Sequence, residues 1–227
     1  MSAEEFTNRA AAYAEARPGY PAAAVDYIRS LAPSGAVFAD VGAGTGKLTV
    51  QLAQYGNPVF AVEPNADMRA QLTLALASFT NAAAVDGMAE HTTLPDASVD
   101  VITCAQALNW FDIPAFGAEC RRIGKPGARI IALFNHEKAQ ENGNARYQKS
   151  IAALYENPTI RSFPNPVSFT REKWLLYFLS MADVPQEGEP GYEAFAREIN
   201  ERFDRERKDG LLRLDLVTKV CWEIPKR

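Results

Sequence analysis

Histidine and cysteine are scarce in this chain of 227 residues, which contains two histidines and three cysteines. The spacing of Cys104, Cys120 and Cys221 matches neither a zinc-binding pattern nor an even disulfide framework. We therefore expect three reduced, mostly buried thiols and no bound metal.

The chain also lacks long apolar runs and clusters of basic residues. Even the apolar run 128–134 is far shorter than the roughly 20 residues of a membrane-spanning helix, and the acidic start 1–5 does not resemble a secretory signal. Lys and Arg number 24 against 28 Asp and Glu, which gives a formal net charge of −4 and no basic stretch suited to a phosphate backbone. We expect a cytoplasmic protein, monomeric or homodimeric, without membrane or nucleic-acid partners.

What the chain does contain is an alternation of apolar strands and amphipathic helices. With 47% hydrophobic and 23% charged residues, its composition is that of one globular domain. Apolar periodicity and turn residues predict helices over 3–16, 21–31, 47–55, 66–77 and 113–123, and strands over 36–41, 59–62, 82–85, 99–104 and 129–134. Repeated strand–helix units with right-handed crossovers predict an α/β fold with a doubly wound, mostly parallel sheet.

The pattern is looser after Asn135. We predict a helix over 144–155, a proline-broken loop over 163–166 and a helix over 171–181. A further amphipathic helix runs from Tyr192 to Phe203. The alternation from Leu212 to Trp222 predicts a half-exposed, antiparallel strand at the edge of the sheet.

A glycine-rich turn, Gly42-Ala43-Gly44-Thr45-Gly46, follows the first strand and precedes a helix. Such turns let a ligand approach backbone N–H groups closely. A phosphate loop would need glycine at Val41 and a hydroxyl residue at Leu48, and a dinucleotide fingerprint would need glycine at Lys47. The third ligand class is S-adenosylmethionine, whose ammonium group suits the acid Asp40 at the strand end.

The second strand ends in Glu63, where a carboxylate can bind both hydroxyls of a ribose. This feature is shared by NAD sites and S-adenosylmethionine sites, so it indicates a nucleoside without identifying the rest of the ligand. A dehydrogenase would also need a second, catalytic domain and a proton-transferring residue. We therefore favour the methyl donor and keep NAD as a weaker alternative.

Five motifs in order resemble those of class I S-adenosylmethionine-dependent methyltransferases, and in particular their small-molecule, trans-aconitate methyltransferase-like branch. They are DVGAGTGKLT (40–49), AVEPN (61–65), LPDASVD (94–100), AQA with NWFD (105–112) and GKPG (124–127). The opening Arg17-Pro18-Gly19-Tyr20-Pro21 fits the same branch. The resemblance implies a seven-stranded Rossmann-like sheet in a single domain 1–227, with a helical lid at 1–35, a donor-binding core at 36–135, and cap helices with the last strands at 136–227.

The resemblance also implies roles for individual residues. Gly42, Ala43 and Gly44 would lie against the methionine part of the donor, with Asp40 near its ammonium and Glu63 on the ribose. The other implied donor contacts are Arg17 at the carboxylate, Asn65, Met68, Met88, Ala89 and Glu90 around the adenine, and Ala105 and Gln106 beside the sulfonium. The branch often has His-Trp-Phe where this chain has Asn109-Trp110-Phe111, so any role of that histidine is lost or altered.

Methyl transfer mainly requires that the nucleophile is held opposite the methyl group and that water is excluded. We expect a small-molecule acceptor methylated at oxygen, on a carboxylate or a hydroxyl. A hydroxyl acceptor would benefit from a base, and His136, just past the fifth predicted strand, is the candidate, with Asn109 and Trp110 as weaker catalytic candidates. A non-catalytic protein that binds the donor or its demethylated product is the alternative.

Overall fold

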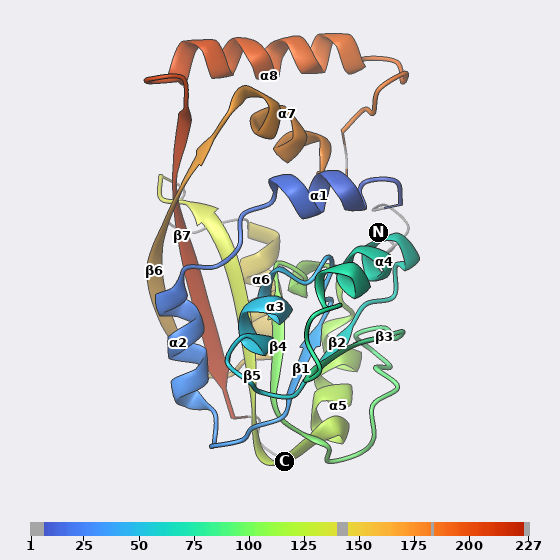
Figure 1. The fold of residues 1–227 in the computed structure, drawn as a ribbon. Coiled ribbons are helices and arrows are strands. Elements are labelled where there is room, and N and C mark those ends of the chain that lie inside the picture. The colour runs from blue at the N-terminus through green and yellow to red at the C-terminus, as the bar shows by residue number, and fades with distance from the viewer. Residues whose placement is uncertain (1–6, 140–144, 183, 225–227) are drawn as a thin grey trace.

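A computed structural model describes residues 7–139, 145–182 and 184–224 (Figure 1). Seven strands form one sheet in the order β3-β2-β1-β4-β5-β7-β6. They are β1 (Phe38–Val41), β2 (Val59–Val62), β3 (Ala82–Val85), β4 (Val99–Ala105), β5 (Gly124–Glu137), β6 (Thr159–Phe169) and β7 (Leu212–Glu223). The first five are parallel, and β7 runs antiparallel to both of its neighbours. The predicted doubly wound, mostly parallel seven-stranded sheet is confirmed.

Helices cover both faces of this sheet because the parallel strands are apolar on both sides. Phe38 joins the core cluster that contains α2 (Ala22–Leu31) and α3 (Lys47–Ala53), whereas its neighbour Ala39 joins the cluster beneath α5 (Ile113–Ile123) and α6 (Ala145–Leu154). The helix α4 (Ala66–Ala75) packs beside β2 and β3. The carboxyl ends of the five parallel strands therefore lie along one edge of the sheet. Helices flank this edge on both faces and do not fill the space above it.

A separate apolar cluster forms a cap above that edge. The far ends of β6 and β7 carry α7 (Arg171–Leu179) and α8 (Tyr192–Glu206), shown at the top of Figure 1. Trp174 is fully buried at its centre, and its Nε1 donates a hydrogen bond to the Ile199 carbonyl at 3.0 Å. The short helix α1 (Ala10–Ala16) lies between this cap and the body of the molecule (Figure 1).

Two predictions for the end of the chain are wrong. The segment 163–166 belongs to β6 and is not a loop, and β7 lies inside the sheet between β5 and β6, so β6 and not the C-terminal strand forms the edge. Pro164 and Pro166 are exposed on this edge strand, where a missing N–H costs no ladder hydrogen bond. The predicted antiparallel direction of β7 is confirmed.

Smaller differences concern element ends. Of the helix predicted over 3–16, residues 3–6 lie outside the described part, and α1 begins at Ala10. Asn144, the predicted start of the helix before Tyr155, also lies outside it. β5 is longer than the predicted strand at both ends, so His136 lies within the strand, paired with Val217.

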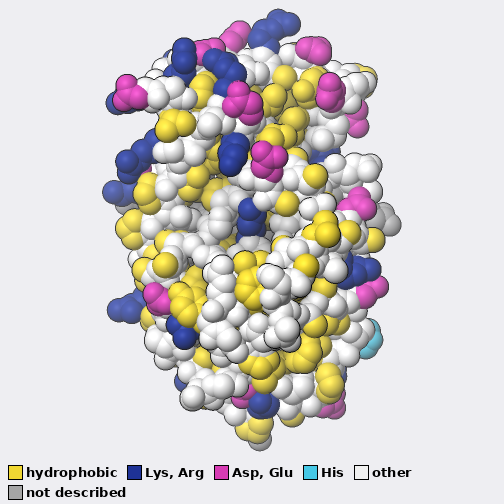
Figure 2. All heavy atoms as spheres, viewed as in Figure 1, with side chains coloured by type: hydrophobic (Ala, Val, Ile, Leu, Met, Phe, Trp, Pro, Cys, Tyr) yellow, Lys and Arg dark blue, Asp and Glu magenta, His cyan; other side chains and the backbone are white. Residues whose placement is uncertain are grey.

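The surface of the cap is charged with both signs. In Figure 2, Lys and Arg side chains mix with Asp and Glu side chains over the cap, and the lower body carries fewer charges on this face. Across the described residues, no helix combines the length and apolar character needed to cross a membrane.

Candidate functional site

The glycine turn is closed by backbone hydrogen bonds to the neighbouring strand. The N–H groups of Gly42 and Ala43 both donate to the Val62 carbonyl, at 2.9 and 3.0 Å. Gly42 has a φ of 69° and Gly44 a φ of 57°, in the left-handed region that favours glycine. A Cβ on Gly42 would lie 2.7 Å from the Ala107 Cβ and 3.0 Å from the Phe111 ring. Glycine at this position therefore lets Ala107 and the Phe111 ring pack directly against the backbone at the end of β1.

Asp40 is a buried carboxylate behind this turn. It is 1% exposed, and its two oxygens accept hydrogen bonds from the hydroxyls of Thr49 at 2.6 Å and Thr103 at 2.8 Å. Burial raises the pKa of Asp40 to about 6, although the two hydroxyls partly oppose this shift. A cationic ligand group nearby would compensate the desolvated charge.

Glu63 connects the end of β2 with the glycine turn. One carboxylate oxygen accepts a hydrogen bond from the Gly44 N–H at 2.8 Å, and the other accepts one from the Asn65 N–H at 2.9 Å. Burial raises the pKa of Glu63, while these two bonds act in the opposite direction. Each carboxylate oxygen keeps a further acceptor site, so the side chain can receive two ligand hydroxyls without losing its backbone partners.

The loop after β3 forms another wall and is fixed to α5. The buried carboxylate of Glu119 accepts hydrogen bonds from the N–H and the hydroxyl of Thr92, and Arg122 pairs with the same carboxylate. These hydrogen bonds, led by the one from Arg122, lower the pKa of Glu119 to about 2. Glu90 accepts a hydrogen bond from the Asp112 N–H at 2.8 Å, and Met88 is 57% exposed.

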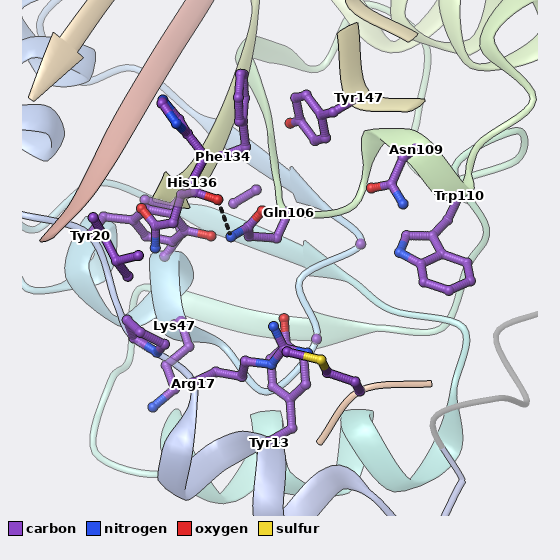
Figure 3. A pocket seen from close by; sticks show the side chains of 18 of the residues that line it. Tyr13, Arg17, Tyr20, Lys47, Gln106, Asn109, Trp110, Phe134, His136 and Tyr147 are labelled. Carbon is purple, nitrogen blue, oxygen red and sulfur yellow. Dashed lines mark hydrogen bonds between the residues drawn. The ribbon is translucent and has the colours of Figure 1, made fainter. Parts of the chain in front are cut away.

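Two cavities of about 510 and 480 Å³ open at the carboxyl edge of the sheet. The first lies beneath the cap and reaches β5 and α6, and Figure 3 shows side chains that line it. The second lies between the ends of β1, β2 and β4 and the loop after β3. Their linings share six residues: Tyr13, Gly42, Gly44, Ala105, Gln106 and Trp110.

Most of the residues predicted from the sequence line these cavities. Besides the shared Gly42, Gly44, Ala105, Gln106 and Trp110, the first cavity is lined by Arg17, Asp40, Ala43, Asn109 and His136, and the second by Glu63, Met68, Met88, Ala89 and Glu90. Asn65 is not among the lining residues that the structure describes. Its side chain caps α4 instead, accepting a hydrogen bond from the Met68 N–H at 3.0 Å.

The cap contributes residues that the sequence did not reveal. The Arg17 Nε donates to the Ser180 hydroxyl at 2.7 Å, and its guanidinium carbon lies 5.2 and 5.1 Å from the ring centroids of Tyr13 and Tyr177. Arg9 donates to the carbonyls of Leu179 and Val184 near the end of α7. Apart from the local contact with Tyr13, these contacts join parts of the chain more than 150 residues apart, and no local pattern in the sequence indicates them.

The turn that carries Arg17 is held by asparagines from two strands. Asn135 on β5 and Asn165 on β6 both donate to the Gly19 carbonyl, at 3.2 and 3.0 Å. Gln51 binds both the N–H and the carbonyl of Tyr20. The turn is thus fixed on both sides, which sets the position of Arg17 and Tyr20 at the cavity wall.

We expect Asn165→Val to keep β6 intact, because valine suits a strand. It should weaken binding of the donor expected from the sequence by less than about tenfold, through the loss of the hydrogen bonds from Asn165 to the Gly19 carbonyl and the Asn135 side chain. Ser162→Val, at an exposed position on the same strand, is the control. Calorimetric titration of the donor checks this. Equal affinities for the two variants would show that Asn165 does not position the turn.

Comparison with known proteins agrees with this architecture. Residues 39–132 match the family model of a methyltransferase domain. An uncharacterized methyltransferase of Mycobacterium tuberculosis is 37% identical over 130 residues, which cover 57% of this chain and 51% of that protein. The chain therefore spans about half the length of the curated mycobacterial relatives that it matches.

Two solved structures share the fold. One is a candidate type II methyltransferase from Anaeromyxobacter dehalogenans (TM-score 0.59, 22% identity, 91% of this chain and 96% of that chain). The other is a SAM-dependent methyltransferase from Aquifex aeolicus (TM-score 0.53, 18% identity, 68% and 89%). These two likenesses show the fold. The matched region 39–132, with its sheet order and its glycine turn next to Asp40 and Glu63, is a methyltransferase domain of class I, the class whose cofactor is S-adenosylmethionine.

Proposed function

We propose that this protein transfers a methyl group from S-adenosylmethionine to an oxygen atom of a small molecule. One observation carries the proposal: two cavities meet at six shared residues at the carboxyl edge of the sheet. A donor nucleoside in one cavity would place its reactive end at the junction, and an acceptor in the other would face it there. The volumes of about 510 and 480 Å³ suit small molecules.

The donor-side residues fit S-adenosylmethionine in charge and shape. Asp40 is a buried anion beside the glycine turn, suited to an ammonium group, and Glu63 has acceptor sites left for ribose hydroxyls. Arg17 reaches the first cavity as a cation suited to the donor carboxylate. Met68 and Ala89 provide buried apolar walls for a base.

When bound, S-adenosylmethionine supplies a methyl group on a cationic sulfur. The protein's part is to orient and desolvate the reacting atoms. Tyr13 and Trp110 line both cavities, and aromatic faces beside a sulfonium stabilise it by about 0.5–2 kcal/mol. The region 1–35, with α1 below the cap, would serve as the lid, 36–135 as the donor-binding core and 136–227 as the acceptor side.

Binding and transfer test this proposal separately. Calorimetric titration with S-adenosylmethionine, S-adenosylhomocysteine and NAD should show binding of the first two only. A labelled-methyl screen over phenols, carboxylic acids and amines should then find an oxygen acceptor. Binding without transfer to any acceptor would favour a non-catalytic binder, and binding of NAD alone would favour an oxidoreductase. The cytoplasmic location, the absence of nucleic-acid partners and the monomeric or homodimeric state stay predictions.

Glu63→Ala should weaken donor binding by about 1–3 kcal/mol, because it removes charged acceptors for the ribose. Glu63→Gln keeps one acceptor oxygen and should lose less. The control is Glu15→Ala, on the exposed side of α1. Calorimetry measures all three, and an unchanged affinity in Glu63→Ala would contradict the ribose role.

A further inference from the structure

His136 has an unusual hydrogen-bonding state in the wall of the first cavity. It lies on β5 beyond the end of β4 and is 9% exposed. Its Nδ1 lies 3.0 Å from the Glu137 carbonyl oxygen. A carbonyl can only accept, so Nδ1 is the donor, and the neutral ring carries its lone pair on Nε2. Nε2 is buried and has no hydrogen-bond partner among the described residues.

A buried acceptor without a partner is costly, so a ligand that donates a hydrogen bond here would be favoured. A carboxylate acceptor has no proton to donate, and its negative charge would face the lone pair. A hydroxyl does have one. The hydrogen-bonding state of His136 therefore selects between the two oxygen acceptors left open by the proposed function.

The walls around His136 select further among hydroxyl compounds. The Phe134 ring centroid lies 5.8 Å from that of His136, and Tyr147, Tyr177 and Leu216 line the same cavity. The Tyr147 hydroxyl is already used, since it donates to the Leu133 carbonyl at 2.8 Å. Tyr147 therefore presents its ring, and the cavity offers aromatic faces suited to a flat aromatic ligand.

The acidity of the hydroxyl points in the same direction. General base catalysis is efficient when the proton transfer is not strongly uphill. A phenol has a pKa of about 10, so its proton passes to a neutral imidazole far more readily than that of a weaker acid. An aliphatic alcohol is much less acidic, so a single histidine would help it less.

We propose that the methyl acceptor is a phenol and that His136 Nε2 is its general base, an inference that rests on the proposed methyl transfer. The phenolic oxygen forms the new O–C bond while its proton passes to Nε2. The electron pair of the broken C–S bond stays on the sulfur, which becomes a neutral thioether. The products are a methyl ether and S-adenosylhomocysteine, and the imidazolium then releases its proton to solvent.

The first test compares phenols of different acidity. His136→Gln should lower kcat roughly 100-fold for a simple alkylphenol, within the range expected for loss of a general base. With p-nitrophenol at about pH 8, which is already largely ionised, the loss in kcat should nearly vanish because no proton has to be removed. Its anion faces the Nε2 lone pair, so it should bind weakly to the wild type, and the comparison is made at saturating substrate. The matched control is His91→Gln, since His91 is exposed and outside both cavities; it should leave both rates unchanged.

Two further measurements separate a chemical role from a structural one. Added imidazole should restore part of the alkylphenol activity of His136→Ala, which a purely structural histidine would not allow. Calorimetry in the presence of S-adenosylhomocysteine should show that His136→Phe binds the alkylphenol more weakly than wild type, while its affinity for S-adenosylhomocysteine alone is unchanged.

The outcomes distinguish this inference from the function on which it rests. Methyl transfer by the wild type to carboxylic acids and not to phenols would overturn the phenol assignment. An equal loss of kcat with the alkylphenol and with p-nitrophenol in His136→Gln would overturn the assignment of the base. Both results would leave the methyltransferase proposal standing. Failure of the wild type to bind S-adenosylmethionine would overturn the proposed function itself.

Discussion

Replacing Gly42 with alanine is expected to lower the free energy of unfolding by about 2–5 kcal/mol and to weaken donor binding roughly 10- to 100-fold. The φ of 69° at this residue is strained for alanine. In addition, the new methyl group would lie 2.7 Å from the Ala107 Cβ and 3.0 Å from the Phe111 ring. Ala107 and Phe111 line the second cavity, so their displacement would deform the donor site.

Gly35→Ala is a matched control for this substitution. Gly35 also has a φ of 69°, but no atom lies within 4 Å of the position of its Cβ. It should therefore show only the strain of the left-handed backbone, about 1–2 kcal/mol, with unchanged donor binding. Chemical denaturation and calorimetry measure both variants. Equal losses of stability, or retained donor binding in Gly42→Ala, would show that the close approach at Gly42 is unimportant.

The strands and the glycine turn of the proposed donor side could be predicted because their signals are local. The strands β1, β2 and β3 are short apolar runs followed by a glycine or an acid, and parallel strands bring their carboxyl ends to one edge. That rule alone places Asp40 and Glu63 at the same edge of the sheet. Asn65 shows the limit of predictions from local signals. An asparagine before a helix can either cap the helix or contact a ligand, and the Asn65 side chain caps α4.

The proposed acceptor side depends on contacts that no local pattern encodes. The prolines of β6 indicate a loop unless the strand is known to form an edge, and this follows only from the pairing with β7. The contact of Arg17 with Tyr177 likewise requires that the cap already be folded over α1. The residues around His136 could therefore not be predicted from the sequence, although His136 itself was a candidate.

Asp40→Asn is expected to stabilise the ligand-free protein at about pH 8 while weakening donor binding, so that the two effects have opposite signs. The pKa of Asp40 is raised from 3.8 to about 6 by burial, which means that the folded state binds the proton more readily than the unfolded state. Its contribution to stability is therefore fully present below about pH 4 and is lost as the pH rises through about 6. An asparagine avoids this loss, worth up to about 3 kcal/mol.

The pH dependence separates this explanation from simple repacking. Denaturation should show the advantage of Asp40→Asn at about pH 8 and its disappearance near pH 4, since wild-type Asp40 is then protonated too. Donor affinity of the wild type should fall as the pH drops below about 6, whereas that of the variant should be low and flat. Thr103→Val removes one hydroxyl donor from the carboxylate. It should raise the pKa of Asp40, so that stability is lost at a higher pH than in the wild type. Two results would contradict this explanation. Lower stability of Asp40→Asn than of the wild type at about pH 8 would show that burial of the charge is not costly, and equal donor affinity would show that the carboxylate does not bind a cationic ligand.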